Sequence, residues 1–204
     1  MATAPRIAVL ISGRGSNLQA LIDAVAEGRL DATIAVVVSN RPDAAGLVRA
    51  RDAGVETVTI DHRGFPSREM FEAALVSELR ARDVSLVCLA GFMRLLGRTV
   101  LDAFPNAILN IHPSLLPAFP GVNAQYQAWE HGVKIAGATV HLVTGELDGG
   151  PIVMQRSVDV RDDDTPATLA ARILAEEHLL YPEAVQRVLR GGWTIVGRRF
   201  VRTD

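Results

Sequence analysis

The first half of the chain alternates short apolar runs with longer segments that have helical periodicity. Continuous runs of Val, Ile and Leu are typical of strands buried on both faces. We expect strands at residues 6–12, 33–39, 56–60, 85–90 and 108–112, and helices near residues 17–27, 43–53, 67–82 and 98–104. Strands that alternate with helices in this way predict a parallel sheet covered on both faces.

Residues at the segment ends support these helices. Ser16 and Ser67 stand where an N-cap is needed, because a serine hydroxyl can accept a hydrogen bond from an otherwise unpaired helical N–H. Gly28 and Gly54 stand where helices would stop, since glycine readily adopts the backbone conformation that ends a helix.

The pattern changes after Pro113. Residues 113–121 contain three prolines and a glycine in the stretch PSLLPAFPG, which predicts a loop. A short helix over residues 124–131 follows, then two longer strands over 135–143 and 151–160, joined by a loop with an Asp-Gly pair. Thr165 and Pro166 predict the start of a final helix, kinked or broken at Pro182 and ended by Gly191-Gly192, and residues 194–201 predict a last small hairpin.

The whole pattern predicts an α/β fold. We expect a doubly wound, mostly parallel sheet, similar to the Rossmann arrangement, with an antiparallel C-terminal extension. No internal repeat or linker interrupts the 204 residues, so we expect one domain over residues 1–204.

Composition excludes several classes of function. A net charge of −2 gives no electrostatic reason to expect a nucleic-acid partner. The single cysteine, Cys88, lies in an apolar run, which indicates a reducing compartment, and the sequence has no zinc cluster. No apolar stretch is long enough to span a bilayer. We therefore expect a cytoplasmic monomer or homodimer without a metal or a membrane partner, which acts on small molecules.

The stretch ILNIHPS at residues 108–114 places two polar side chains in an apolar strand. Asn110 and His112 point to the same face, roughly 6.6 Å apart along the strand, because side chains alternate between faces. They stand at the carboxyl end of a central strand, where open α/β sheets bind ligands. The alternative is a hydrogen-bonded pair in the core, although apolar residues would avoid the cost of burial at both positions.

Asp148 lies in the sequence ELDGGP between the two longer strands. Asp-Gly is common turn chemistry, so a plain turn is one interpretation. If the hairpin extends the sheet, its tip instead brings a carboxylate to His112. An amide, an imidazole and a carboxylate are suited to acyl transfer to an amine, with Asn110 and protonated His112 holding the oxyanion and Asp148 fixing the histidine. Ser114 has no glycine elbow and Cys88 is expected to be buried, so direct transfer without an acyl-enzyme is favoured.

The first strand runs into the glycine-rich turn SGRGSN at residues 12–17. Glycines and the free N–H groups of a helix start favour a bound anion. Leu18 stands where a dinucleotide-binding motif has its third glycine, and the second strand ends in Ser39-Asn40-Arg41 without an acid, so NAD is disfavoured. A terminal phosphate site and a simple tight turn remain the two interpretations.

Six stretches together carry a resemblance to a known family: SGRGSN (12–17), SREMF (67–71), LAGFMRLL (89–96), LNIHPSLLP (109–117), GATVHLVTGELDGGPI (137–152) and EEHLLYP (176–182). In this order they resemble the glycinamide ribonucleotide formyltransferases of purine biosynthesis. The resemblance implies transfer of a formyl group from 10-formyltetrahydrofolate to the glycinamide amine of a phosphoribosyl substrate. It implies that Asn110, His112 and Asp148 are the catalytic residues.

The resemblance also implies the binding residues. Those for the ribonucleotide are Gly13, Arg14, Gly15, Ser16, Asn17 and Glu177. Those for the formyl-folate are Arg68, Met93, Arg94, Leu95, Leu96, Thr144, Gly145, Glu146 and Leu147. His141 is a lesser candidate, because it can also be a hydrogen-bonded strand residue. The chain departs from the family at Arg14, between the glycines, and at residues 122–125, where the family often carries histidines.

Three other functions share this core. A formyl-folate hydrolase normally carries an extra N-terminal domain, whereas the predicted core begins at Arg6. A methionyl-tRNA formyltransferase needs a C-terminal domain and basicity that a net charge of −2 does not supply. A non-catalytic nucleotide-binding module would have no use for a convergent amide, imidazole and carboxylate.

Overall fold

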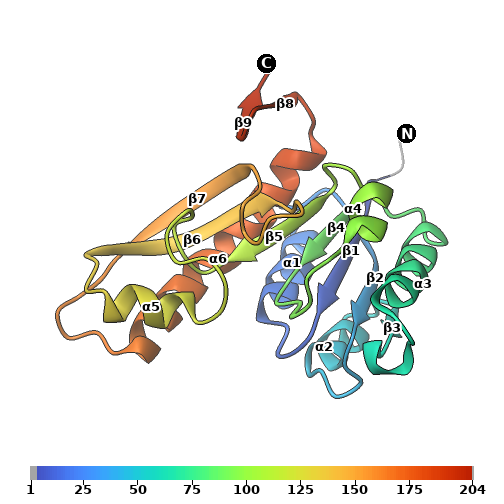
Figure 1. Cartoon of the computed structure of the whole chain (residues 1–204), viewed down its shortest axis with the longest axis horizontal. Helices are drawn as coiled ribbons and strands as arrows, with labels where there is room; N and C mark the ends of the chain where they lie inside the picture. Colours follow the sequence, from blue (N-terminus) through green and yellow to red (C-terminus); the bar gives the residue numbers. More distant parts are fainter. Residues whose placement is uncertain (1–3, 204) are drawn as a thin grey trace. The chain divides into compact units, whose positions relative to one another are not determined.

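The computed structural model describes residues 4–203 (Figure 1). It divides into two compact units, an N-terminal unit up to Leu109 and a C-terminal unit from Asn110. The boundary falls inside strand β5 (Ile108–His112). The expectation of one domain over the whole chain stays a prediction.

The N-terminal unit is built on a parallel sheet. Its strands are β1 (Arg6–Ile11), β2 (Thr33–Ser39), β3 (Thr57–Thr59) and β4 (Leu86–Leu89), in the order β3-β2-β1-β4. All three pairings are parallel, as the alternation of strands and helices predicts. The first residues of β5 continue this sheet, since Val87 N donates to Ala107 O at 2.9 Å. The interiors of β1 and β4 and the second half of β2 are buried, which explains their apolar sequence, whereas the short strand β3 is only partly buried.

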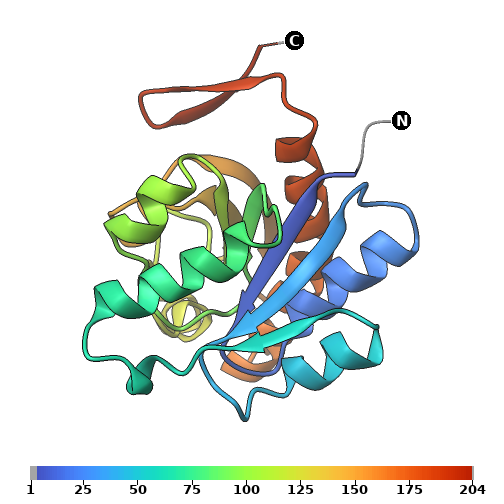
Figure 2. The same cartoon turned by 90° about the vertical axis from the view of Figure 1, so that its right-hand side faces the viewer.

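Helices cover both faces of this sheet. They are α1 (Ser16–Ala26), α2 (Gly46–Asp52), α3 (Arg68–Arg80) and α4 (Arg98–Ala103), with a 3₁₀ turn η1 (His62–Gly64) before α3. Figure 2 shows α1 and α2 on one side of the strands and α3 and α4 on the other. The doubly wound arrangement is therefore confirmed for this unit.

Three of the four residues predicted to start or stop these helices do so. Ser67 accepts a hydrogen bond from Met70 N and caps α3 as predicted, while Gly28 and Gly54 follow α1 and α2 with left-handed φ angles of 71° and 70°. The prediction of Ser16 as N-cap is wrong. Gly15 is the cap of α1, in a left-handed conformation that serine would adopt only at a cost, and Ser16 is already helical.

The C-terminal unit contains the antiparallel part of the fold. Strands β6 (Ile135–Leu142) and β7 (Ile152–Asp159) form the predicted hairpin, and α5 (Ala124–Glu130) precedes it. The predicted last hairpin is also present, as β8 (Trp193–Val196) and β9 (Arg199–Arg202). The order in this unit is β6-β7-β9-β8, because β9 pairs with β7 in parallel.

Helix α6 (Pro166–Leu189) packs against β6 and β7. The helix begins with a capping box, in which the side-chain oxygen of Thr165 accepts from Thr168 N and the side-chain oxygen of Thr168 accepts from Thr165 N. The predicted break at Pro182 is wrong, because the helix is continuous from Pro166 to Leu189, while a kink at this proline stays a prediction. Proline removes one helical hydrogen bond, but the fully buried Leu180 and Tyr181 beside it pack into the core and stabilise the helical backbone.

Candidate active site

Two polar side chains emerge from the end of β5. His112 is buried with 4% of its surface exposed, and Asn110, two residues earlier on the same face, is half-buried. Both belong to the C-terminal unit. Their neighbours come from a strand and two loops of that unit.

Asp148 lies in the loop between β6 and β7 and faces His112. Its Oδ2 atom lies 3.5 Å from Nδ1 of His112 and accepts a hydrogen bond from Gly121 N at 2.8 Å. The backbone of Asp148 is left-handed, with φ 49°, which aspartate adopts more readily than most residues. Asp148 is therefore both a turn residue and a carboxylate beside His112, so the two interpretations of the sequence hold together.

His141, from β6, lies between Asn110 and Asp148. Its Nδ1 atom is 3.0 Å from Leu142 O, and because a carbonyl only accepts, Nδ1 carries a proton. Its Nε2 atom is 3.1 Å from Nδ2 of Asn110 and 3.6 Å from Oδ1 of Asp148. Nε2 therefore stands between a donor and an acceptor: it accepts from the Asn110 amide when the ring is neutral, and it donates to the Asp148 carboxylate when the ring is protonated. His141, which the sequence made only a lesser candidate, thus lies at the centre of the cluster formed by Asn110, His112 and Asp148.

The carboxyl group of Asp148 is poised to be ionised. Burial opposes its charge and is the largest single effect, but the His141 hydrogen bond, the Gly121 N–H and the two imidazoles together hold the pKa of Asp148 below its ordinary value. Asp148 is therefore a carboxylate at neutral pH.

Both ring nitrogens of His112 have acceptors as neighbours. Nε2 lies 2.9 Å from Phe119 O and must donate to it, while Nδ1 faces the Asp148 carboxylate. A doubly protonated ring satisfies both acceptors at once. The contributions of Phe119 O and Gly121 N have no signature in the sequence, because backbone groups are common to all residues.

The glycine turn lies in the N-terminal unit, between β1 and α1. Gln19 N donates to Gly15 O, and no side chain caps the first turn of α1. That turn reads Ser-Asn-Leu-Gln, without an acid to compete for an anion. An ideal Cβ on Gly15 would lie 2.6 Å from Gly46 Cα, whereas one on Gly13 would meet nothing within 4 Å. Gly15 is therefore needed for close packing on α2, and Gly13 faces open space.

Arg14, in this turn, is exposed, and its backbone carbonyl accepts a hydrogen bond from Arg49 Nε at 3.0 Å. Ser12, just before the turn, is buried and joins two segments. Its hydroxyl donates to Asn40 Oδ1 at 2.6 Å and accepts from Met93 N at 2.8 Å. Ser12 was missed from sequence, although a serine and an asparagine that follow two neighbouring buried strands were a usable signal.

Arg68 and the segment Met93–Leu96 come together in the N-terminal unit. Arg68 donates to Leu95 O at 2.7 Å and to the buried Glu72 at 2.8 Å, and Glu72 also accepts from Gly97 N at 2.6 Å. Glu72 was missed, because a carboxylate four residues after an arginine on a helix reads as a surface pair.

Exposure separates the other residues of this segment. Met93 and Leu95 are 71% and 65% exposed and offer an apolar surface. Leu96 is buried, so its side chain belongs to the core, and Arg94 is half-buried.

The remaining candidates lie in the C-terminal unit. The loop residues Thr144, Gly145 and Glu146 fold back on themselves, with Glu146 N donating to Thr144 Oγ1, and Leu147 is 57% exposed. Glu177 is a buried residue of α6, with 5% of its surface exposed. The roles of all these residues stay predictions.

Over residues 4–203, no cluster of three or more His, Cys, Asp or Glu side chains is arranged to hold a metal ion. Within the same range, no helix has the length and apolar character to cross a membrane.

Comparison with known proteins defines the class. Residues 5–185 match the family model described as formyl transferase. A phosphoribosylglycinamide formyltransferase from Escherichia coli is 46% identical over 176 residues, which cover 86% of this chain and 83% of that protein. The human trifunctional purine biosynthetic protein adenosine-3 is also 46% identical, but the match covers 91% of this chain and only 18% of that protein. The chain thus spans less than a fifth of the length of such trifunctional relatives.

Solved structures of the same class have the same fold as this chain. The glycinamide ribonucleotide transformylase 1 of Symbiobacterium toebii superposes with a TM-score of 0.97 at 55% identity, covering 100% of this chain and 96% of the other. The matched family model and the matched fold thus define the class to which the chain belongs, that of the formyl transferases. The chain belongs to the formyl transferase family and, within it, to the phosphoribosylglycinamide formyltransferases of purine biosynthesis.

Proposed function

We propose that this chain moves the formyl group of 10-formyltetrahydrofolate to the glycinamide amine of 5-phosphoribosylglycinamide. The observation that carries the proposal is the cluster in which Asp148 lies within 3.6 Å of both His112 and His141, while His141 contacts Asn110. Amide, imidazole and carboxylate groups in mutual contact are what an acyl transfer to an amine requires.

The residues of the cluster have separate tasks in this reaction. The amine attacks the formyl carbon, and the negative charge that develops on the formyl oxygen is stabilised by the Asn110 amide and the protonated His112 ring. Asp148 holds His112 and accepts the proton that the amine loses. The bond from the formyl carbon to N10 of the folate then breaks, N10 takes up a proton, and tetrahydrofolate and the formylated ribonucleotide are released.

His112 has to change one partner to take part. Its Nε2–H is donated to Phe119 O, and Nδ1 is directed to Asp148. Donation to the formyl oxygen therefore requires the Phe119 carbonyl to give way, whereas Asn110 keeps one amide hydrogen available beyond the one directed at His141.

The glycine turn is proposed to bind the ribonucleotide phosphate, through the N–H groups at the start of α1, with Arg14 adding positive charge. Glu177 is proposed to contact the same substrate. We propose that the exposed apolar side chains of Met93, Leu95 and Leu147 contact the formyl-folate. Arg68, which donates to Leu95 O, is proposed to bind the same cosubstrate.

The test is a product assay that also separates a transferase from a hydrolase. The enzyme is incubated with formyl-folate, with and without glycinamide ribonucleotide. Mass spectrometry measures the formylated ribonucleotide, and tetrahydrofolate release is followed by absorbance. We expect release only with the acceptor, because an amine anchored by its phosphate has a large kinetic advantage over untethered water. Comparable release without the acceptor, with free formate as product, would assign the hydrolase function instead.

A further inference from the structure

The C-terminal hairpin β8–β9 reaches the loop that carries Asp148. Arg198, in the turn between the two strands, donates from Nη2 to Gly149 O at 2.5 Å. Its Nη1 atom also lies 3.9 Å from the Glu146 carboxylate. Arg198 thus bonds the residue directly after Asp148 and pairs with the residue two positions before it.

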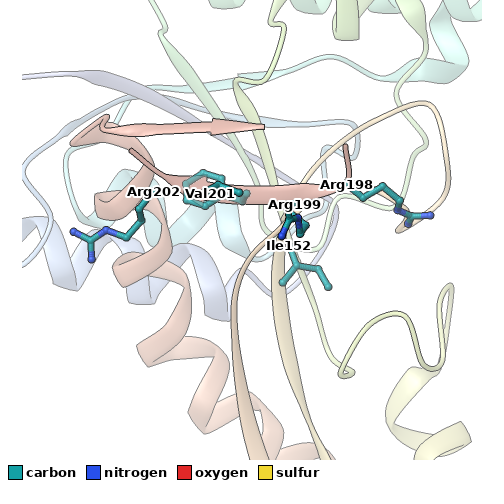
Figure 3. Close-up of a pocket in the computed structure, with 6 residues that line it drawn as sticks. Ile152, Arg198, Arg199, Val201 and Arg202 are labelled. Atoms are coloured by element: carbon teal, nitrogen blue, oxygen red, sulfur yellow. The ribbon is translucent and has the colours of Figure 1, made fainter. Parts of the chain in front are cut away.

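The hairpin is firmly attached to its own unit. Trp193 stacks on Phe200 with ring centroids 4.9 Å apart, and its Nε1 donates to Val188 O, near the end of α6. Strand β9 pairs with β7 through Arg199 and Ile152, the first residue after the loop region. Figure 3 shows Arg198 and Arg202 extending toward opposite ends of the hairpin, so only one of them is directed at the loop.

The loop needs such a tether, because its backbone is under constraint. Asp148 has a φ of 49°, a conformation that costs a non-glycine residue free energy. Gly149 packs so closely on Glu146 that a Cβ would lie 2.6 Å from its carboxylate, and a Cβ on Gly150 would overlap Leu142 O. The peptide that Arg198 holds lies between these two close contacts.

We propose that Arg198 is a positioning residue, which holds the Gly149–Gly150 peptide and thereby the loop that carries Asp148, so that the carboxylate faces His112 and His141. The proposal rests on the catalytic role given to Asp148 above. The hairpin lies beyond the family-model match, which ends at residue 185. Arg198 therefore lies outside the region that matches the family model, whereas the loop that it contacts lies inside that region.

The bond to the carbonyl matters more than the ion pair with Glu146. The Arg198 side chain is 71% exposed, and exposed ion pairs contribute little because water and salt screen them. A charge-assisted hydrogen bond from a planar guanidinium instead fixes direction, and it holds the backbone of the loop one residue beyond Asp148.

The experiment compares Arg198→Ala with Arg198→Lys and with a matched control, Arg199→Ala, which removes an exposed arginine one residue away. With both substrates saturating, we expect kcat of Arg198→Ala to fall about 5- to 10-fold, the usual effect of losing one hydrogen bond of ordinary net strength, because the Arg198 side chain is exposed. The KM for the ribonucleotide should stay unchanged. Arg198→Lys should recover part of kcat, and Arg199→Ala should match the wild type.

Hydrogen exchange gives a second readout that does not depend on activity. Amides of residues 144–150 should exchange faster in Arg198→Ala, while those of β6 and α6 keep their protection. Equal kcat in Arg198→Ala and Arg199→Ala, or unchanged exchange in the loop, would overturn the proposal. An active Asp148→Asn variant would instead overturn the catalytic role on which it rests, so the two failures are distinguishable.

Discussion

Asp148 and His141 lie 3.6 Å apart, between Oδ1 of the carboxylate and Nε2 of the ring, and the other carboxylate oxygen faces His112. One carboxylate thus serves two imidazoles, and one of them continues to Asn110. The cluster is a connected network in which the orientation of each group depends on the next.

Removing the charge of Asp148 or the ring of His112 should stop most turnover. In both Asp148→Asn and His112→Ala we expect kcat to fall roughly 100- to 1000-fold, because His112→Ala removes an oxyanion donor and Asp148→Asn removes the group that accepts the amine proton. Steady-state kinetics measures kcat, and calorimetry should show ribonucleotide binding near the wild-type affinity. A variant that keeps near wild-type kcat would remove that residue from the mechanism.

His141 should matter through its neighbours. In His141→Leu the Asn110 amide and one oxygen of Asp148 lose a buried partner, which costs about 1–3 kcal/mol, or roughly 5- to 150-fold in kcat. The KM values should change little. His141→Gln, whose amide oxygen can still accept from Asn110, should recover part of the loss. Wild-type kcat in His141→Leu would show that β6 only carries a core histidine here.

The elements of the fold could be predicted because their signals are local. The strands of the N-terminal unit lie within two residues of their predicted ends, since burial on both faces requires unbroken apolar runs such as Ile7–Ile11. The continuity of α6 through Pro182 could not be predicted in this way. Local propensity opposes it, and the packing of Leu180 and Tyr181, which sequence does not reveal, overrides that propensity.

The site was predictable only in part, for a similar reason. Asn110 and His112 were visible as polar interruptions of an apolar strand. His141 was underrated because its two partners lie 31 residues earlier and seven residues later in the chain, and alternation along β6 says nothing of them. Phe119 O and Gly121 N are backbone groups, and no sequence pattern marks them.

Gly13 is a better probe of the phosphate site than Gly15. A side chain at Gly15 would collide with Gly46, so a substitution there disturbs the packing of α1 on α2. A side chain at Gly13 meets no atom within 4 Å, and in Gly13→Val it should crowd the N–H groups without unfolding the chain. We expect the KM for the ribonucleotide to rise about 10-fold or more, with an unchanged melting temperature. Equal affinity of the wild type for the dephosphorylated riboside would remove the phosphate from the proposal.

Asp164 should make the stability of the folded protein depend on pH in the acidic range. Its carboxylate, 2% exposed, accepts two hydrogen bonds from Arg172 at 2.7 and 2.8 Å and one each from Arg161 N and Thr168 Oγ1 at 2.8 Å. The Arg172 hydrogen bond, followed by that from Arg161 N, holds the pKa of Asp164 well below its ordinary value. A lowered pKa in the folded state stabilises the fold fully above the unfolded pKa of about 3.9, and the stabilisation is lost as pH falls through the lower folded value.

The variant Asp164→Asn tests this dependence, with Asp162→Asn as its control. Asp162 is 94% exposed and pairs with Lys134, which is 77% exposed, so its replacement should leave the melting temperature nearly unchanged. Asp164→Asn should melt several degrees lower than the wild type at pH 7, because it leaves Arg172 without its ionised partner at the start of α6. The gap should narrow below about pH 4, because the unfolded wild-type chain then binds a proton at residue 164 while the folded protein stays ionised there, and asparagine binds none in either state. Thermal melts from pH 3 to pH 7 measure the gap, and a gap that stays constant over that range would mean that Asp164 contributes through shape and not through its charge.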